Sequence, residues 1–398
     1  MDQNSLIKEY FTKMAQIQER VLNFLDNEEK NDQNFKNLID FLKDQKNLED
    51  ANDLKLFLNL ISRISNYHRR GKDFFQKVEA IINYYLDDMK RLFSDFDIFL
   101  IFKVNIRILY FLLHEKIISI NYDIYRIIFD IFGYSGMTYL SINYEFGTKI
   151  PEIKEDVDPQ IISLKKSGES EKISFGLIRN DSLNQFIEFV NKNNKSVDAY
   201  GKSEYETNYV LIDKNVSFIE YAAFNGAVQI FKYLLVNKAK IMPKIWNYSI
   251  HGQNSEIIHL IEENSIKPED DDYNLCIKEA IRCYANDIGY YLIENYSENA
   301  NFLNDAIRYN NFEYISDNIE LLLENINSFA DNKSAYYNIL YCFCEYNYAN
   351  AVKILIKNPE FNINEKTIHK YFYFDTLKIH KISLYISYGI FSLFILQN

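Results

Sequence analysis

The sequence predicts an all-α protein built from repeated pairs of short helices. Its 398 residues include only 11 glycines and 5 prolines, too few for the many tight turns of a β-sandwich or barrel. Segments with apolar residues at helical spacing recur along the chain, as in 35–42, 54–64 and 74–93. Hydrophobic residues make up 47% of the chain and charged residues 25%, which supplies a packed core and argues against global disorder.

Composition and charge exclude several classes of function. The net charge of −12 and the pI of about 5.2 make the whole molecule repel a phosphate backbone, so no nucleic-acid partner is expected. The four cysteines lack a disulfide-dense pattern, and the first 14 residues are too polar for a secretory signal, so a cytoplasmic location is expected. Tyr, Asn, Ile and Lys are so frequent that biased codon usage explains them. A single tyrosine therefore carries little information.

The clearest repeat unit covers residues 213–239. It is predicted to form a turn, a first helix, a break at Asn225-Gly226 and a second helix. Ser217 and Glu220 have the S-x-x-E spacing of a capping box, in which each side chain satisfies a backbone amide at the start of a helix. The small pair Ala222-Ala223 allows the second helix to approach closely. The second helix has one apolar face at helical spacing, formed by Val228, Ile230, Phe231, Leu234 and Leu235.

This unit resembles the ankyrin repeat, whose pattern is roughly T-P-L-H-x-A-A-x-x-G-x-x-x-V-V-x-x-L-L-x-x-G-A. The unit departs from the pattern at Phe218 for Pro, Glu220 for His and Lys238 for the closing Gly. The resemblance implies a solenoid of stacked helix pairs, with the capping box in place of the hydroxyl–imidazole contacts usual in the family. The positions that match without a gap are Ser217, Ile219, Ala222-Ala223, Gly226, Ile230-Phe231, Leu234-Leu235 and Ala239.

Further copies extend the pattern along the chain. Weaker copies follow within 248–261, 279–293, 305–308 and 341–356, and a loose one precedes at 174–190. Upstream, the second-helix apolar positions recur at a shift of 122 residues, so the N-terminal segment is predicted to share the helix-pair architecture. The whole stretch 34–362 resembles a large expanded family of divergent ankyrin-type proteins of protists, which carries no established activity. The upstream positions are Ile106, Ile108-Leu109 and Leu112-Leu113.

The predicted organisation has two helical arrays and an irregular linker. The linker is placed where glycine and proline cluster and helical periodicity weakens. From the N-terminus, the predicted segments are a polar helix or tail at 1–30, a helical array of degenerate pairs at 31–132, the linker at 133–172, an ankyrin-repeat array at 173–373 and an apolar segment at 374–398.

The apolar C-terminal segment has three interpretations. Residues 382–396 carry no charge, but spanning a bilayer needs roughly 20 apolar residues. The stretch is therefore either a last helix packed on the array, a tail anchor that contacts a membrane, or the product of a reading-frame change. An uncovered apolar end is also an aggregation hazard.

The ankyrin resemblance implies which residues contact a protein partner. Variable positions beside the alanine pair face the concave side in that family, and the preceding turn projects from it. Ordinary solvated helix ends are the alternative interpretation. The residues concerned are Phe224, Asn225, His251, Gln253, Arg282 and Arg308, with Asp213, Lys214 and Asn215 at the projecting turn.

No catalytic, cofactor-binding or metal-binding residues are predicted. The chain lacks the phosphate-binding patterns G-x-x-x-x-G-K-[ST] and G-x-G-x-x-G, and also G-x-S-x-G and H-E-x-x-H. Cys342 and Cys344 would point apart on a helix and are better explained as core thiols. His251 and His259 belong to different predicted helices. The basic cluster 67–72 is expected to be a solvated loop, with binding of an acidic partner as the alternative.

The predicted function is non-enzymatic protein–protein interaction, as an adaptor or scaffold. Three alternatives remain open: a membrane-associated scaffold held by the C-terminal segment, a degenerate family copy without function, and an enzyme with an unrecognised site in the N-terminal helices. The sequence identifies no partner and no stoichiometry.

Overall fold

The computed structural model describes residues 2–27, 32–44, 48, 50–143, 151–269, 272–297, 301–327 and 333–357. Most of these residues lie in helices, which confirms the all-α prediction. The described helices are α1 (Gln3–Asp26), α2 (Asp32–Asp44), α3 (Ala51–Tyr67), α4 (Phe74–Tyr84), α5 (Leu86–Leu92), α6 (Asp95–Phe102), α7 (Ile106–His114), α8 (Tyr122–Tyr139), α9 (Pro159–Ser167), α10 (Ile173–Arg179), α11 (Leu183–Lys192), α12 (Phe218–Phe224), α13 (Val228–Val236), α14 (Ile245–Gly252), α15 (Ser255–Glu263), α16 (Asn274–Arg282), α17 (Asn286–Tyr296), α18 (Leu303–Tyr309), α19 (Phe312–Asp317), α20 (Ile319–Asn327), α21 (Lys333–Glu345) and α22 (Ala349–Leu355).

Two short antiparallel strand pairs accompany these helices. Strand β1 (Ile142–Asn143) pairs with β2 (Glu152–Ile153). Strand β3 (Tyr200–Gly201) pairs with β4 (Val216–Ser217), with Gly201 opposite Val216. The second pair closes the long connection between α11 and α12.

The chain divides into two compact units. The first contains residues 1–23, 31–60 and 301–398, and the second contains 24–30 and 61–300. The predicted linker 133–172 falls inside the second unit. This segment includes β1, β2 and α9. That this segment separates two arrays stays a prediction. The apolar segment 374–398 lies outside the described residues.

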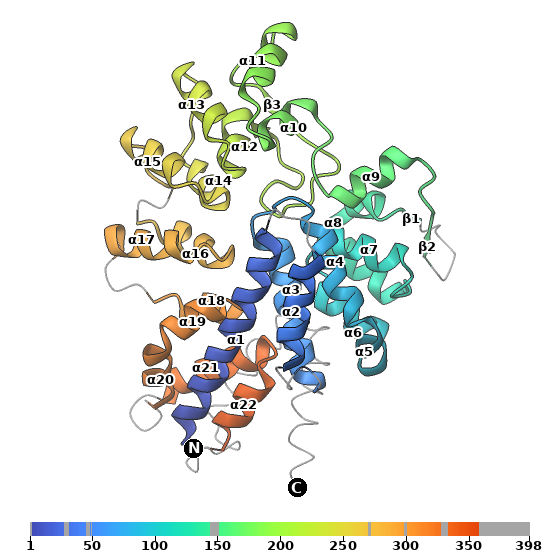
Figure 1. Ribbon diagram of the computed structural model, residues 1–398, viewed down its shortest axis with the longest axis vertical. Helices are drawn as coiled ribbons and strands as arrows, with labels where there is room; N and C mark the ends of the chain where they lie inside the picture. Colours follow the sequence, from blue (N-terminus) through green and yellow to red (C-terminus); the bar gives the residue numbers. More distant parts are fainter. Residues whose placement is uncertain are drawn as a thin grey trace. The chain divides into compact units, whose positions relative to one another are not determined.

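The second unit contains a run of consecutive helix pairs (Figure 1). In this run α10 packs on α11, α12 on α13, α14 on α15 and α16 on α17. The first helices of successive pairs also pack on one another, α10 on α12, α12 on α14 and α14 on α16. The second helices make their own row, in which α11 contacts α13 and α13 contacts α15. Each pair therefore buries its apolar side against its neighbours.

The first helix of the clearest unit starts and stops as its sequence predicts. Ser217 accepts a hydrogen bond from the Glu220 amide, and the Glu220 carboxylate accepts one from the Ser217 amide, which confirms the capping box. At the other end Gly226 has φ +65°, and the Ala227 amide donates 2.9 Å to the Ala222 carbonyl. This hydrogen bond runs from the sixth residue of the turn back to the first, as in a Schellman motif. It satisfies a carbonyl that the helix end would otherwise leave unpaired.

The same termination recurs where the sequence has no glycine. After α10, α16 and α21, a residue with positive φ is followed by an amide that bonds to the carbonyl five residues earlier. The second helices α11, α13 and α15 end in the same way. At the end of α13 the residue is Lys238, with φ 61°, at the position where the ankyrin pattern has glycine. The backbone conformation of the helix ends therefore repeats more faithfully than the residues do.

The correspondence at a shift of 122 residues extends to the structure. Helix α7 is followed by Lys116, with φ 56°, and the Ile117 amide bonds to the Leu112 carbonyl. In α13 the equivalent residues, 122 further on, make the same turn and the same bond. Helix α6, which packs on α7, also begins with a capping box, formed by Ser94 and Asp97. Helices α6 and α7 thus pack on each other in the N-terminal segment, and that this segment shares the repeat architecture stays a prediction.

Backbone contact between α12 and α14 fixes the spacing of the first-helix row. A Cβ atom built on Gly252 would lie 2.0 Å from the Ala223 carbonyl oxygen and 2.8 Å from the Gly226 nitrogen. A Cβ on Gly226 would lie 2.7 Å from the Gly252 carbonyl oxygen. These separations leave no space for a side chain, so the two helix ends touch through their main chains.

The first unit has an aromatic core that includes the N-terminal helix. The ring of Phe11 on α1 lies 5.6 Å from Phe343 and 6.0 Å from Tyr348. Gln18 accepts a hydrogen bond from the Phe312 amide at 2.6 Å through its Oε1 atom. Residues 1–30, predicted as a polar helix or tail, therefore include a helix with one buried face. Its buried side chains in this unit are Ile7, Phe11, Met14, Ile17, Gln18 and Val21.

The contact between α12 and α14 predicts opposite outcomes for two glycine substitutions. We expect Gly252→Ala to lower the free energy of unfolding by about 2 kcal/mol or more, because the new methyl group overlaps backbone atoms that cannot rotate away. Gly289→Ala in α17 is the matched control, since its Cβ would meet only the Ala280 Cβ at 3.5 Å. There we expect no loss, and a gain of up to about 1 kcal/mol from helix propensity. Urea denaturation measures both, and equal effects of the two substitutions would contradict the steric explanation.

The positive φ of Lys238 predicts a stabilising substitution. A side chain in the left-handed region costs roughly 1 kcal/mol, which glycine does not incur. We expect Lys238→Gly to raise the free energy of unfolding by about 1 kcal/mol in a denaturation experiment. Lys238→Ala also removes the charge but keeps the Cβ atom, so it separates the two effects. A similar gain from both variants would refute a conformational cause.

Candidate protein-interaction surface

The predicted contact face is formed by the first helices α12, α14 and α16. The connection between β3 and β4, residues 202–215, folds over this face and is called the 202–215 loop below. The side chains of Thr207, Asn208 and Leu211 in this loop are each 3% exposed or less. The loop is therefore packed into the second unit, in contrast to the short turn that an ankyrin repeat has at this place.

Tyr209 attaches the loop to α14 and α16. Its hydroxyl donates a hydrogen bond to the Oε1 atom of Glu279 on α16. His251 on α14 places its Nε2 atom 2.6 Å from the same oxygen and 2.8 Å from the Tyr209 hydroxyl. His251 is only 1% exposed. The three side chains form one buried polar cluster that connects two successive helix pairs with the loop.

Two more side chains complete this cluster. Arg282 on α16 donates from Nη1 to the Oε2 atom of Glu279 at 3.1 Å. Its guanidinium also lies 5.5 Å from the Tyr209 ring centre and 5.8 Å from that of Tyr67, the last residue of α3. The Tyr67 and Tyr209 rings meet edge to face at 4.7 Å. The Tyr209 ring is thus held between an aromatic edge and a cation, both of which favour an aromatic side chain.

The cluster shifts the pKa values of its acidic groups in opposite directions. Burial alone raises the pKa of Glu279, but hydrogen bonds and positive charge from His251, with Arg282 and Tyr209, outweigh burial and leave the pKa lowered. Burial raises the pKa of the Tyr209 hydroxyl well above its usual range, and the Glu279 carboxylate acts in the same direction. Glu279 is therefore a carboxylate at neutral pH and Tyr209 a neutral donor.

The other end of the loop is anchored at a buried arginine. Glu206 lies 3.5 Å from Arg70, which follows α3, and both side chains are 8% exposed. Arg70 also donates from Nη1 to the Gly168 carbonyl and to the Thr207 hydroxyl, each at 3.1 Å. The Thr207 amide and hydroxyl both donate to the same Gly168 carbonyl. Burial raises the pKa of Glu206, although the charge of Arg70 acts against it.

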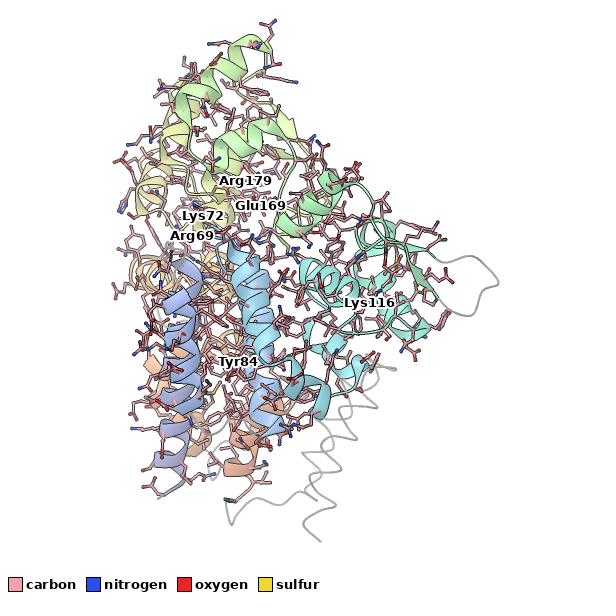
Figure 2. The ribbon with its side chains drawn as sticks, turned by 45° about the vertical axis from the view of Figure 1, so that its right-hand side comes forward. Arg69, Lys72, Tyr84, Lys116, Glu169 and Arg179 are labelled. Carbon is pink, nitrogen blue, oxygen red and sulfur yellow. The ribbon has the colours of Figure 1, made fainter. Side chains whose placement is uncertain are left out.

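The Arg70 guanidinium does not use all of its N–H groups in hydrogen bonds to the described residues. It lies 4.7 Å from the ring centre of Phe75 on α4. Its Nε and Nη2 atoms are buried and have no hydrogen-bond partner among the described residues. Nearby, Arg179 on α10 and Glu169 form an ion pair at 3.1 Å, and Figure 2 shows the two side chains next to each other. The surroundings of the loop anchor therefore include several closely spaced charges of both signs.

The predicted projecting turn is exposed in the structure. Asp213, Lys214 and Asn215 are all exposed at the end of the 202–215 loop. Asp213 is bonded on both sides, to Lys202 at 3.2 Å and to the Ser135 hydroxyl at 3.0 Å.

Three predicted contact residues are half-buried at the helix ends. The Phe224 ring stacks on the His251 ring at 5.3 Å. Asn225 ends α12 and donates from Nδ2 to the Tyr221 carbonyl at 2.8 Å. Gln253 ends α14 with φ 49°, and its buried Nε2 atom has no hydrogen-bond partner in the described part of the chain. These side chains partly face solvent, and most of their contacts are within the fold.

Two predicted contact residues lie elsewhere than the resemblance implied. His251 is buried in the Tyr209 cluster, so its side chain is removed from the exposed contact surface. Arg308 is exposed on α18, which belongs to the first unit, while the other candidates belong to the second. Within the second unit, the structure gathers Phe224, His251 and Arg282 around Tyr209.

The basic cluster 67–72 is only partly a solvated loop. Arg69 and Lys72 are exposed, as Figure 2 shows. His68 is 3% exposed and its ring nitrogens lie 2.9 Å from the Asp26 carboxylate and 3.2 Å from the Cys283 carbonyl. With Arg70 also buried, the expectation of a solvated loop is wrong for two of its basic side chains. Both are used as internal anchors.

The cysteines and cavities offer little chemistry in the described residues. Cys276 and Cys283 are buried, and Cys342 and Cys344 are half-buried on α21. No group of three or more His, Cys, Asp or Glu side chains in this part of the chain is arranged to hold a metal ion. The best-formed hollow lies beneath the 202–215 loop, beside Glu206 and Tyr221, and has room for about one water molecule.

Sequence reasoning missed the residues that organise this face. Tyr209 and Glu206 lie in a stretch without helical periodicity, and tyrosine is so frequent that no single one stands out. Glu279 was visible only as part of a repeat copy. The available signal was the length of the interval between the end of α11 and the capping box at Ser217, which is far longer than a repeat turn requires.

The comparisons with known proteins cover part of this face. Residues 236–318 match the model of a family described as a domain of unknown function, DUF3447. This interval begins at the end of α13 and includes the helices from α14 to α19. No curated protein and no solved structure matches the chain. The family match is to a domain without an assigned activity, so it adds no substrate or partner.

One alternative interpretation was a membrane-associated scaffold, so the described helices were compared with what a membrane span requires. None of them combines the length with the apolar character needed to cross a bilayer. The apolar segment 374–398 lies outside the residues to which this finding applies.

The lowered pKa of Glu279 predicts a pH-dependent contribution to stability. The folded pKa lies below the ordinary value of about 4.3, so the carboxylate stabilises the fold above that pH, and the contribution is lost as pH falls through the folded pKa. We expect Glu279→Gln to lower the free energy of unfolding by about 2 kcal/mol at pH 7, and by progressively less below about pH 4.3.

Glu206→Gln provides the control with the opposite sign. Because burial raises the folded pKa of Glu206, its contribution is present below the ordinary pKa and is lost as pH rises through the folded value. The loss in free energy of unfolding caused by this substitution should therefore become smaller as the pH rises from acidic to neutral. Urea denaturation of both variants from about pH 2.5 to 7.5 tests the pair, and parallel pH profiles would contradict both assignments.

Proposed function

We propose that this protein is a non-enzymatic protein-interaction module of the ankyrin-repeat type. Its stacked helix pairs form a solenoid in the second unit, and its partner is another protein bound as by an adaptor or scaffold. The four cysteines of the described chain are free thiols, which fits the reducing environment of the cytoplasm. We place the protein there as part of the same proposal.

The observation that carries the proposal is the repeated geometry of α10 to α17. Four consecutive helix pairs stack with first helix on first helix, and α10, α11, α12, α13, α15 and α16 end in the same backbone conformation. Arrays of this kind bury each pair only against its neighbours and leave a long continuous surface. Such surfaces suit recognition of proteins, whereas small-molecule sites need concave pockets of several hundred cubic ångströms. The step from fold to function is by analogy with other repeat proteins.

The exposed turn supports the same proposal. Asp213, Lys214 and Asn215 present an acid, a base and an amide together at the edge of the stacked helices. Arg282 adds a partly exposed cation on α16, with its side chain 31% exposed. Mixed charges at the rim of a contact surface set which partners are accepted and how fast they associate.

The proposal is tested by affinity capture with the full-length tagged chain from its own cells. We expect recovery of at least one partner protein to fall by about tenfold or more when Asp213, Lys214 and Asn215 are all replaced by alanine, the equivalent of about 1.4 kcal/mol. These side chains are exposed, so the fold should be retained.

The matched control replaces Glu188, Asn191 and Lys192 by alanine. These residues are also an acid, an amide and a base, and they are exposed on α11. Recovery should be unchanged with this variant. Equal recovery with all three chains would remove the turn from the binding surface, and recovery of no protein above background would count against a binding function.

A further inference from the structure

The 202–215 loop is closed at its ends and packed along its length. Strands β3 and β4 pair at Gly201 and Val216, so the loop leaves and re-enters the fold at one point. Such Ω-shaped loops are commonly functional. Because the loop closes on itself, it can detach without moving α11 or α12, which contact the fold through their own faces.

Two side chains, three residues apart, hold the loop down. Glu206 meets Arg70, and Tyr209 enters the cluster formed by His251 and Glu279. Between them, the Thr207 amide and hydroxyl bond to the backbone carbonyl of Gly168. An acid, a backbone donor and a tyrosine thus contact three separate points of the unit in sequence order. A folded domain recognises a short peptide segment through separate contacts of this kind.

The groups that contact the loop could also bind another segment that carries the same side chains. Arg70 offers two buried N–H atoms, Nε and Nη2, that no described group accepts. Arg282 and Tyr67 provide a cation and an aromatic edge for any phenol ring placed between them. The Glu279 carboxylate accepts a hydrogen bond from the hydroxyl of the ring. These groups select an acidic residue followed three positions later by a tyrosine.

We infer that the 202–215 loop is an internal ligand, and that the protein partner binds by displacing it. The partner presents a segment in which an acidic residue precedes a tyrosine by three positions, as Glu206 precedes Tyr209. This inference rests on the proposed protein-binding function and specifies its partner. In the free protein the loop keeps the site closed, because a segment tethered at both ends competes at an effective concentration in the millimolar range.

The inference is tested with a synthetic peptide that has the sequence of residues 203–213. The receptor is the full chain with Glu206→Ala and Tyr209→Ala, which removes both anchors of the internal loop. We expect the peptide to bind this double variant at least tenfold more tightly than the unaltered chain, measured by fluorescence anisotropy. A peptide with alanine at the two anchor positions is the matched control and should bind neither chain. A folded double variant that binds both peptides equally would overturn the inference.

A second measurement uses the unaltered chain and does not depend on the fold of a variant. Hydrogen exchange should show local opening of the loop, so that the amides of Thr207, Val210 and Ile212 exchange at least tenfold faster than those of Ala223 and Ile250 in α12 and α14. All of these amides are in structured segments of the second unit. Loop amides that exchange only together with the helix amides would show that the loop is a permanent part of the core, and the inference would fail.

The two experiments separate this inference from the proposed function. Local opening together with selective peptide binding supports a displaceable ligand, even if affinity capture yields no partner. Partner capture with a loop that never opens locally would leave the binding function standing and refute the internal ligand.

Discussion

Contact between main chains at Ala223, Gly226 and Gly252 is the constraint on which the second unit depends. Where a Cβ atom would lie 2.0 Å from a carbonyl oxygen, two helix ends meet without side chains between them. That contact sets the spacing of α12 and α14, and the same helix terminations set the direction in which each second helix departs. The side chains of successive first helices then point to a common face. His251 on α14 and Glu279 on α16, from different pairs, both reach the hydroxyl oxygen of Tyr209.

Polar groups buried on that face make the loop specific to it. A buried carboxylate is costly unless its oxygens are bonded, and Glu279 receives bonds from three side chains. Removing any one of them leaves charge or donor groups unsatisfied, so the arrangement favours a single position of Tyr209. Arg70 and Glu206 act in the same way at the other end of the loop, although two N–H atoms of Arg70 keep no described partner. Buried charged and polar contacts therefore attach the loop at two places, at Arg70 and at Glu279.

The position of these anchors bears on the way the protein is proposed to work. The match to a domain of unknown function starts at residue 236, after the 202–215 loop, and covers His251, Glu279 and Arg282. The receiving side of the face thus lies partly within the matched interval, while the segment that occupies it lies outside.

The sequence by itself determined the local structure of this protein. Helical periodicity, the capping box at Ser217 and Glu220, and the break at Gly226 depend on neighbouring residues, and each was predicted correctly. Which residues lie on the contact face depended instead on residues far apart in the sequence. Tyr209, His251, Glu279 and Arg70 come from four separate segments, and none has a local pattern that distinguishes it from other polar residues. Only the tertiary structure decided that His251 is buried and that the face is already occupied, because burial follows from how the helix pairs stack and where a long loop returns.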